Sequence, residues 1–237
     1  VFHIKFFENL NFYSRKETLL PLGAFIGASL VGLADDWLDI RQLGHKGRGI
    51  RFRFKIFLYA AVAAIGAWWF YFKLDFSLIH IPFVGNVDFG WWYIPFFILA
   101  VVSTSFAVNE TDGLDGLAGG TLLLAFFAFG TIAFSQGKYD LVAFLSVVCG
   151  GLMAFLWFNV YPARFIMGDT GSMGLGVLLA VVAFLTNSIF LMAIIGFVFM
   201  AETVCLLLQL FWKKFLHKKL FLSAPIHHHF QALGWPE

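Results

Sequence analysis

The sequence predicts an all-α protein, a polytopic membrane helix bundle with about seven transmembrane helices. Hydrophobic residues make up 60% of the 237 residues and charged residues only 13%, about half the share in a soluble domain. The apolar residues form uncharged runs of about 20 residues, the length that crosses a bilayer as a helix. The runs do not alternate, so strands of a β-barrel are not expected. A soluble enzyme, a nucleic-acid-binding protein and a disordered chain are excluded.

The predicted spans follow one another along the chain. The first is short and contains Pro21 near its start. The last apolar run is long enough for two spans, with Thr186-Asn187-Ser188 as the turn between them. The runs are 18–34, 56–72, 89–109, 116–137, 141–163 and 170–201, the last of which continues after Glu202 to Trp212. Between the second and third runs, residues 76–87 are expected to form a short hairpin or an interfacial helix.

Basic residues divide unevenly between the two alternate sets of connecting loops. One set comprises 37–55, 110–115, 164–169 and 213–237. These loops contain eleven Lys and Arg residues, whereas the other set contains only Lys73 and Lys138. Because cytoplasmic loops of membrane proteins carry the excess of positive charge, the first set is predicted to be cytoplasmic.

The same loops also concentrate polar and acidic residues. The four segments are Asp35-Asp36, Asn109 to Gly116, Asn159 to Ser172 and Ala224 to His229. One acid at the end of a span is inexpensive and needs no special explanation. Four such segments on one side of the membrane are harder to explain by loop polarity alone. We therefore interpret them as parts of one site.

The chemistry of these residues indicates phosphoryl transfer. Carboxylate and amide oxygens suit a hard cation such as Mg²⁺. Residues 168–172 precede an apolar helix, whose first N–H groups favour an anion. Asp112 and Asp115 would share one face if that stretch were helical. Asp35 and Asp36 would point about 100° apart on a helix, so we expect them to have different partners.

Two further polar features have competing explanations. Three adjacent histidines, 227–229, could suggest zinc, but their spacing cannot place three nitrogens on one helix face. We interpret them as hydrogen-bond donors to a diphosphate or as a proton relay. Glu202 within the last span is either a functional intramembrane acid or a bundle-facing carboxylate bonded to a neighbouring helix, with Gln209 on the same face. The second interpretation needs no ligand and is favoured.

In order along the chain, the first three segments resemble the signatures of the polyprenyl-phosphate N-acetylhexosamine-1-phosphate transferase superfamily. The stretch Ala224-Pro225-Ile226-His227-His228-His229-Phe230, followed by Gly234-Trp235-Pro236-Glu237, is narrower. It resembles the phospho-N-acetylmuramoyl-pentapeptide transferase family. Glu202 and Gln209 also fall where that family has a Glu and a Gln ahead of its histidine loop.

The resemblance implies a Mg²⁺-dependent transferase, multi-pass in the bacterial inner membrane, with its active site on the cytoplasmic face. A polyprenyl phosphate would attack the sugar-bearing phosphorus of UDP-N-acetylmuramoyl-pentapeptide, releasing UMP and forming the first lipid-linked peptidoglycan precursor. Membrane lipid and a second copy in a homodimer are the other expected partners. The alternatives are a sister N-acetylglucosamine-1-phosphate transferase, a membrane transporter, and an inactive scaffold.

The resemblance also implies roles for individual residues. The implied catalytic residues are Asp35, Asp36, Asp169, His227, His228 and His229. The implied substrate-binding residues are Asn109, Asp112, Gly113, Asp115, Asn159, Arg48 and Lys55. Asp169 is the leading metal ligand, and Asp115 and Asp36 (or Asp35) are further ligands. Asp35 or Asp36 would be a general base of small effect, because a phosphate monoester is already largely dianionic at neutral pH.

The chain departs from the family pattern at several places. The family has ten spans, so the seven counted here suggest a single membrane-embedded transferase domain, 1–237, that is a fragment or a short form. Asp39 stands where the family often has Lys, and Glu110 where it has Leu. Ile166 precedes Met-Gly-Asp where an aromatic residue is usual, with Phe165 one place earlier.

Overall fold

The computed structural model describes residues 16–44 and 49–235, and it is a helix bundle. Six helices are long and apolar enough to cross a membrane. They are α2 (Lys16–Ile40), α3 (Phe52–Lys73), α4 (Tyr93–Thr111), α5 (Leu117–Ser135), α6 (Tyr139–Asn159) and α7 (Gly168–Leu185). Each matches one of the predicted apolar runs, so the predicted class of polytopic helical membrane protein is confirmed.

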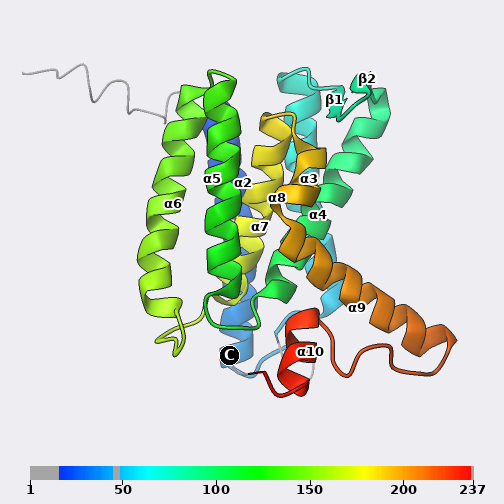
Figure 1. Cartoon of the computed structure of the whole chain (residues 1–237). Helices are drawn as coiled ribbons and strands as arrows, with labels where there is room; N and C mark the ends of the chain where they lie inside the picture. The colour runs from blue at the N-terminus through cyan, green and yellow to red at the C-terminus, as the bar shows by residue number, and fades with distance from the viewer. Residues whose placement is uncertain (1–15, 45–48, 236–237) are drawn as a thin grey trace, which may run out of the picture.

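The seventh predicted span is bent. After the turn at 186–188 come η4 (Ile189–Leu191), α8 (Met192–Ile195) and α9 (Phe197–Phe215). The stretch 189–195 is bent by 85° relative to α9. If the two together are counted as one broken span, the number of candidate spans in the described residues rises from six to seven. Gly196 lies at the break, and α9 therefore slants away from the bundle axis instead of running parallel to α7 (Figure 1).

Helix α7 is the centre of the bundle. From Ser172 to Leu185 nearly every side chain is buried, and most are Leu, Val, Ala or Gly. Such small and medium side chains let helices approach closely, which is how helices associate in a membrane. Large apolar side chains such as Phe57 and Trp68 instead remain exposed on the outer surface, as expected of residues that face lipid.

The two ends of the bundle differ in chemistry. At one end, β1 (Leu78–Ile81) pairs antiparallel with β2 (Gly85–Asp88), so the hairpin predicted as one alternative for 76–87 is confirmed. At the other end α2, α4 and α6 finish, α3, α5 and α7 begin, and the short helix α10 (Ile226–Ala232) packs beneath them (Figure 1). We call these the hairpin end and the polar end.

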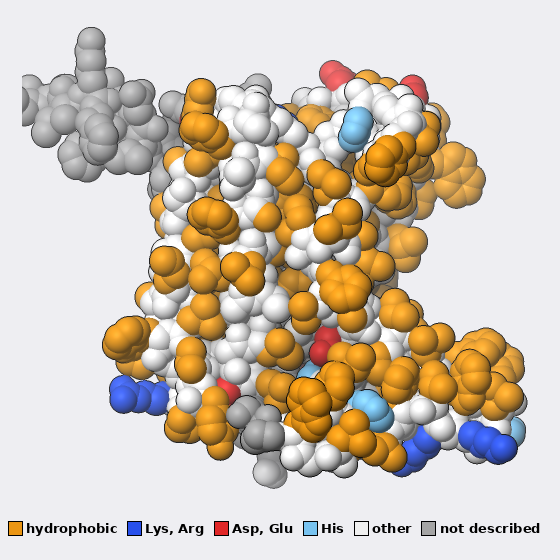
Figure 2. Space-filling view, viewed as in Figure 1, with side chains coloured by type: hydrophobic (Ala, Val, Ile, Leu, Met, Phe, Trp, Pro, Cys, Tyr) orange, Lys and Arg blue, Asp and Glu red, His pale blue; other side chains and the backbone are white. Residues whose placement is uncertain are grey.

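Basic side chains gather at the polar end. Among the described residues this end carries Arg41, Arg51, Arg53, Lys55, Arg164, Lys213, Lys214, Lys218 and Lys219. Lys73 and Lys138 lie at the opposite end. Figure 2 shows the visible Lys and Arg side chains along the lower edge of the molecule, with the hairpin at the top. The division predicted from the sequence therefore corresponds to two physical ends of one bundle.

Candidate active site

A close crossing of α2 and α7 creates the site. Gly32 of α2 lies directly against the start of α7, and a Cβ atom there would come within 2.6 Å of the Asp169 carbonyl carbon and 2.8 Å of the Thr170 Cα. No side chain larger than hydrogen fits in that space. Because Gly32 permits this contact, the residues one turn further along α2, Asp35 and Asp36, lie beside the first turn of α7.

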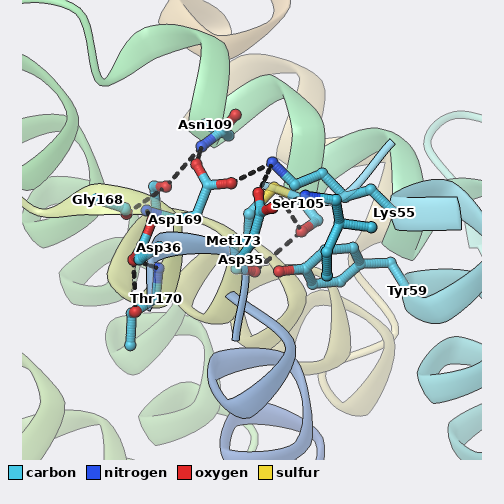
Figure 3. A network of polar contacts seen from close by, with 12 residues as sticks. Asp35, Asp36, Lys55, Tyr59, Ser105, Asn109, Gly168, Asp169, Thr170 and Met173 are labelled. Carbon is cyan, nitrogen blue, oxygen red and sulfur yellow. Dashed lines mark hydrogen bonds and ion pairs between the residues drawn. The ribbon is translucent and has the colours of Figure 1, made fainter. Parts of the chain in front are cut away.

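Asp35, Lys55 and Asp169 form a charge cluster between three helices. The Lys55 ammonium pairs with Asp35 at 2.6 Å and also with Asp169, and these side chains are only 10–20% exposed. The backbone N–H of Ile50 donates to Asp35 Oδ1 at 2.5 Å. Tyr59, one helical turn after Lys55, is fully buried beneath the cluster. Figure 3 shows the two carboxylates turned toward the same ammonium group.

Asp36 has a different set of partners. Its carboxylate accepts hydrogen bonds from the backbone N–H groups of Asp169 (3.1 Å) and Thr170 (2.9 Å), and from the Thr170 hydroxyl (2.6 Å). Asp36 thus satisfies the free N–H groups at the start of α7. The place where the sequence suggested a bound phosphate is held by a carboxylate of the protein itself. As expected, Asp35 and Asp36 have separate partners.

Asn109, at the end of α4, holds Asp169 from the other side. Its side-chain amide donates to Asp169 Oδ1 at 2.7 Å and to the Ser172 hydroxyl at 2.9 Å. Ser172 in turn donates to the carbonyl of Gly168 at 2.7 Å. Asp169 is therefore fixed by an amide on one oxygen and by the Lys55 ammonium on the other (Figure 3).

The loops that follow α4 and α6 are hydrogen-bonded to each other. Asp115 accepts from the backbone N–H of Ala163 at 2.8 Å. Asn159, which is buried, accepts from the N–H of Gly116 at 3.0 Å and donates to the Phe165 carbonyl at 3.1 Å. Two of the predicted segments are thus joined. Their contacts place Asp115 against the 160–165 loop rather than in the Lys55 cluster.

Asp112 lies between these two groups of residues. Helix α4 ends at Thr111, so Asp112 and Asp115 do not share a helical face. The N–H of Gly168 donates to the Asp112 carboxylate. Burial, and to a smaller extent the charges of Asp169 and Asp36, raise the pKa of Asp112 to about 6. The negative charges of Asp169 and Asp36 therefore contribute to the raised pKa of Asp112.

The histidine segment forms α10. His228 pairs with Gln231 at 2.8 Å, and His229 Nδ1 accepts from the backbone N–H of Leu222 at 3.2 Å. His227 is buried and its ring packs against Gly113, so the fourth predicted segment contacts the second. All four segments therefore meet at the polar end.

Two residues that the sequence did not assign to the site, Glu202 and Gln209 of α9, hold the histidine segment. Glu202 Oε2 accepts from the backbone N–H of Ile226 at 2.6 Å. Gln209 accepts from the N–H groups of Leu220 (3.0 Å) and Phe221 (2.9 Å) and donates to the Phe221 carbonyl (3.1 Å). The favoured interpretation of Glu202, a carboxylate bonded to a neighbouring helix, is confirmed. Their seven-residue spacing, two turns on one helix face, was the available signal.

Asp35 and Asp169 are the residues of the cluster that could hold a divalent cation. In residues 16–44 and 49–235, no group of three or more His, Cys, Asp or Glu side chains could hold a metal ion. Mg²⁺ does not require one, since it usually takes one or two carboxylates and completes its shell with water and substrate phosphates. The Lys55 ammonium between the two carboxylates shows that this position accepts positive charge. The residues present therefore fit a Mg²⁺ ion.

The predicted site residues fall into three groups. Asp35, Asp36, Lys55, Asn109 and Asp169 are linked directly around the start of α7. Asp112, Asp115 and Asn159 border them in the loop pair, and Gly113, His227, His228 and His229 form the side closed by α10. Arg48 lies outside the described residues.

The sequence is similar to known proteins over most of its length. The sequence model for glycosyl transferase family 4 matches residues 18–187, the stretch from α2 to the end of α7. Several curated relatives bear the name phospho-N-acetylmuramoyl-pentapeptide-transferase. The one from Chloroflexus aggregans is 41% identical over 240 aligned residues, which cover 96% of this chain and 65% of that relative.

Relatives from other bacteria give the same result. The protein of that name from Clostridium perfringens strain 13 is 39% identical, covering 93% of this chain and 69% of its own length. The one from Geobacillus sp. strain WCH70 is also 39% identical, over 93% of this chain and 68% of that relative. The chain thus spans about two-thirds of the length of the curated relatives it matches.

Proposed function

The chain belongs to glycosyl transferase family 4, and we propose that it transfers phospho-N-acetylmuramoyl-pentapeptide from UDP to a polyprenyl phosphate. An oxygen of the acceptor phosphate forms a bond to the sugar-bearing phosphorus of the donor. The bond from that phosphorus to the bridging oxygen breaks, and UMP leaves. The product is a lipid-linked diphosphate sugar, the first lipid-linked precursor of peptidoglycan.

One observation carries this proposal, namely the meeting of two carboxylates, an ammonium and an amide at one end of a membrane bundle. Asp35, Asp169, Lys55 and Asn109 come from four different helices and contact one another. Phosphoryl transfer asks the protein mainly to position groups and to neutralise charge. A cluster at the membrane surface also suits a lipid acceptor whose phosphate lies at that depth and a donor that arrives from water.

In this proposal Asp169 and Asp35 would hold Mg²⁺, which would supply positive charge to neutralise the donor diphosphate. Asn109 keeps the Asp169 carboxylate turned toward that position, through its 2.7 Å hydrogen bond. Lys55 carries a positive charge that can turn from the carboxylates to a phosphate oxygen. Asp36 acts on structure, since its three hydrogen bonds fix the first turn of α7.

The polar end faces the cytoplasm of a bacterial inner membrane in this proposal. The excess of Lys and Arg at that end supports the orientation. The donor is a water-soluble nucleotide sugar, so a cytoplasmic site gives it access. Asp112, Asp115 and Asn159, beside the carboxylates, are the residues we assign to the uridine side of the donor.

The experiment is a UMP-release assay on the purified protein in detergent, with polyprenyl phosphate and Mg²⁺. We expect UMP from UDP-N-acetylmuramoyl-pentapeptide and no UMP from UDP-N-acetylglucosamine. The variant Asp169→Asn should lose release at least 100-fold, because a charged ligand is removed. The matched control is Asp39→Asn, an exposed acid on the same end of α2, which should keep activity.

Two results would reject the assignment. Release only from UDP-N-acetylglucosamine would identify the sister transferase instead. Ion flux in liposomes without any UMP release would favour a transporter, whose ionisable residues are expected near the bilayer midplane and not at one end.

A further inference from the structure

The geometry assigns Glu202 as a positioning residue that turns His227 so that its Nε2 atom faces the turn at 112–116, which carries residues that we assign to donor binding. The assignment rests on the proposed function, because it gives His227 a donor phosphate to bind. Glu202 itself is not expected to touch substrate. It acts through the imidazole ring of His227 and through the start of α10.

Glu202 is buried against the first residues of α10. Only 2% of it is exposed, in a helix whose neighbours are apolar. Its Oε2 atom accepts from the backbone N–H of Ile226 at 2.6 Å and, more weakly, from that of His227 at 3.4 Å. A buried carboxylate without such partners would be strongly disfavoured. These contacts satisfy the buried Glu202 carboxylate with N–H groups at the start of α10.

The other oxygen of Glu202 faces the His227 ring. Glu202 Oε1 and His227 Nδ1 are 3.1 Å apart, and the histidine side chain is only 4% exposed. The pair is close enough for attraction, although the ring is turned away from ideal hydrogen-bond alignment. A carboxylate oxygen can only accept, so the Nδ1 atom beside it carries the hydrogen. The second nitrogen, Nε2, is then left for another partner.

Nε2 of His227 has no such partner among the described residues. It is buried and makes no hydrogen bond. It packs against the backbone of Gly113, where an added Cβ atom would meet Nε2 first and the ring carbon Cε1 at 3.0 Å. A buried polar atom without a partner costs free energy, which a ligand at this position would offset.

The seam between α10 and the turn at 112–116 is therefore where a donor oxygen would reach Nε2. Asp112 on this turn touches the start of α7 through Gly168, which places the seam next to the carboxylate cluster. A phosphate oxygen only accepts hydrogen bonds, so Nε2 binds it as the N–H donor of a doubly protonated ring. His227 thereby contacts the diphosphate, and Glu202 fixes its orientation.

Gln209 offers a matched control. It lies two turns after Glu202 on the same helix and holds residues 220–221, without touching His227. Its loss would loosen the loop ahead of α10. It would leave the carboxylate beside His227 in place, so loosening of the loop and orientation of the ring can be measured separately.

The first test is a double-mutant cycle on UMP release by the full chain. Glu202→Gln and His227→Gln should each lower release about tenfold, the effect of losing a charged hydrogen bond. The double variant should be no slower than His227→Gln alone, because Glu202 acts only through that ring. The effects of Gln209→Ala and His227→Gln on the rate of UMP release should instead multiply in the double variant. An undiminished effect of Glu202→Gln in the His227→Gln background would overturn the assignment.

The second test does not depend on activity. Diethyl pyrocarbonate modifies accessible histidines, and mass spectrometry locates the modified residue. His227 should be protected in the wild type, whereas the exposed His217 should react. Glu202→Ala should make His227 reactive, and Glu202→Asp should restore part of the protection. Equal protection in Glu202→Ala would contradict the assignment. A protein that releases no UMP but still shows this pattern would reject the proposed function while retaining the Glu202–His227 pair.

Discussion

Adjacent carboxylates in this protein do different work because their neighbours differ. Asp35 pairs with Lys55, and Asp36 binds the N–H groups at the start of α7. Removing either carboxylate should therefore have different consequences. Loss of Asp35 leaves an ammonium with one fewer partner, whereas loss of Asp36 leaves helix N–H groups unsatisfied at the position that orients Asp169.

The pKa of Asp112 gives a prediction at the residue scale. It is raised from 3.8 to about 6, mainly by burial. Between these values the folded protein binds a proton that the unfolded chain does not, so stability falls as the pH rises from about 4 to about 6. Asp112→Asn removes this loss. The free energy of unfolding of the variant, relative to that of the wild type, should therefore be about 1 kcal/mol higher at pH 8 than at pH 5, after allowance for solvent screening.

Unfolding of the purified protein in detergent, with EDTA and without substrate, measures this difference. EDTA matters because a bound cation would favour the charged carboxylate and hide the effect. If the gap between Asp112→Asn and the wild type were the same at both pH values, burial would not govern this carboxyl group.

Side-chain partners were the part of the site that the sequence predicted least. Lys55 was expected to bind substrate, and the sequence did not predict its additional ion pairs with Asp35 and Asp169. Glu202 reaches a backbone group 24 residues away. Such partners depend on which helices cross and at what height. The sequence shows that a charged side chain is present. Its partner is determined by how the helices cross in the folded protein.

At the scale of elements, the approach of α2 to α7 decides whether the site exists. Gly32 sits at the crossing, whereas a Cβ atom added at Gly23, earlier on the same helix, would have nothing within 4 Å. The same substitution at the two positions should thus have different effects on stability. Gly32→Ala should destabilise the protein by about 2 kcal/mol through overpacking. Gly23→Ala should be neutral or slightly stabilising, because alanine favours helix.

Thermal unfolding of both variants tests the crossing. Gly32→Ala should also lower UMP release, since pushing the helices apart moves Asp35 away from Asp169. Equal stability of the two variants would show that α2 and α7 do not meet at Gly32.

The helices themselves could be predicted because length and hydropathy suffice for them. The first five uncharged runs each became one helix, and α2 extends furthest beyond its expected end, to Ile40. The 85° bend ahead of α9 was not expected. No proline marks it, and a glycine at 196 is one of many glycines in the chain. The bend matters for the site, because it carries Glu202 and Gln209 across to the histidine segment.

At the scale of the whole molecule, polar residues from four segments that are distant in the sequence lie together at one end of the bundle. Residues near 35, 109, 169 and 227 lie far apart in sequence and are brought together because alternate helices begin and end at the same surface. The sequence predicted this meeting from the side of the membrane that each loop occupies. It could not predict that Asp115 would bind the 160–165 loop instead of joining Asp169.

The central claim is that Asp169 and Asp35 form one binding site for a divalent cation at the polar end. Binding of Mn²⁺, followed by electron paramagnetic resonance on the purified protein, tests it most directly. The account predicts one Mn²⁺ per chain in the wild type and in Asp39→Asn, and loss of that ion in Asp169→Asn. Undiminished Mn²⁺ binding by Asp169→Asn would contradict it.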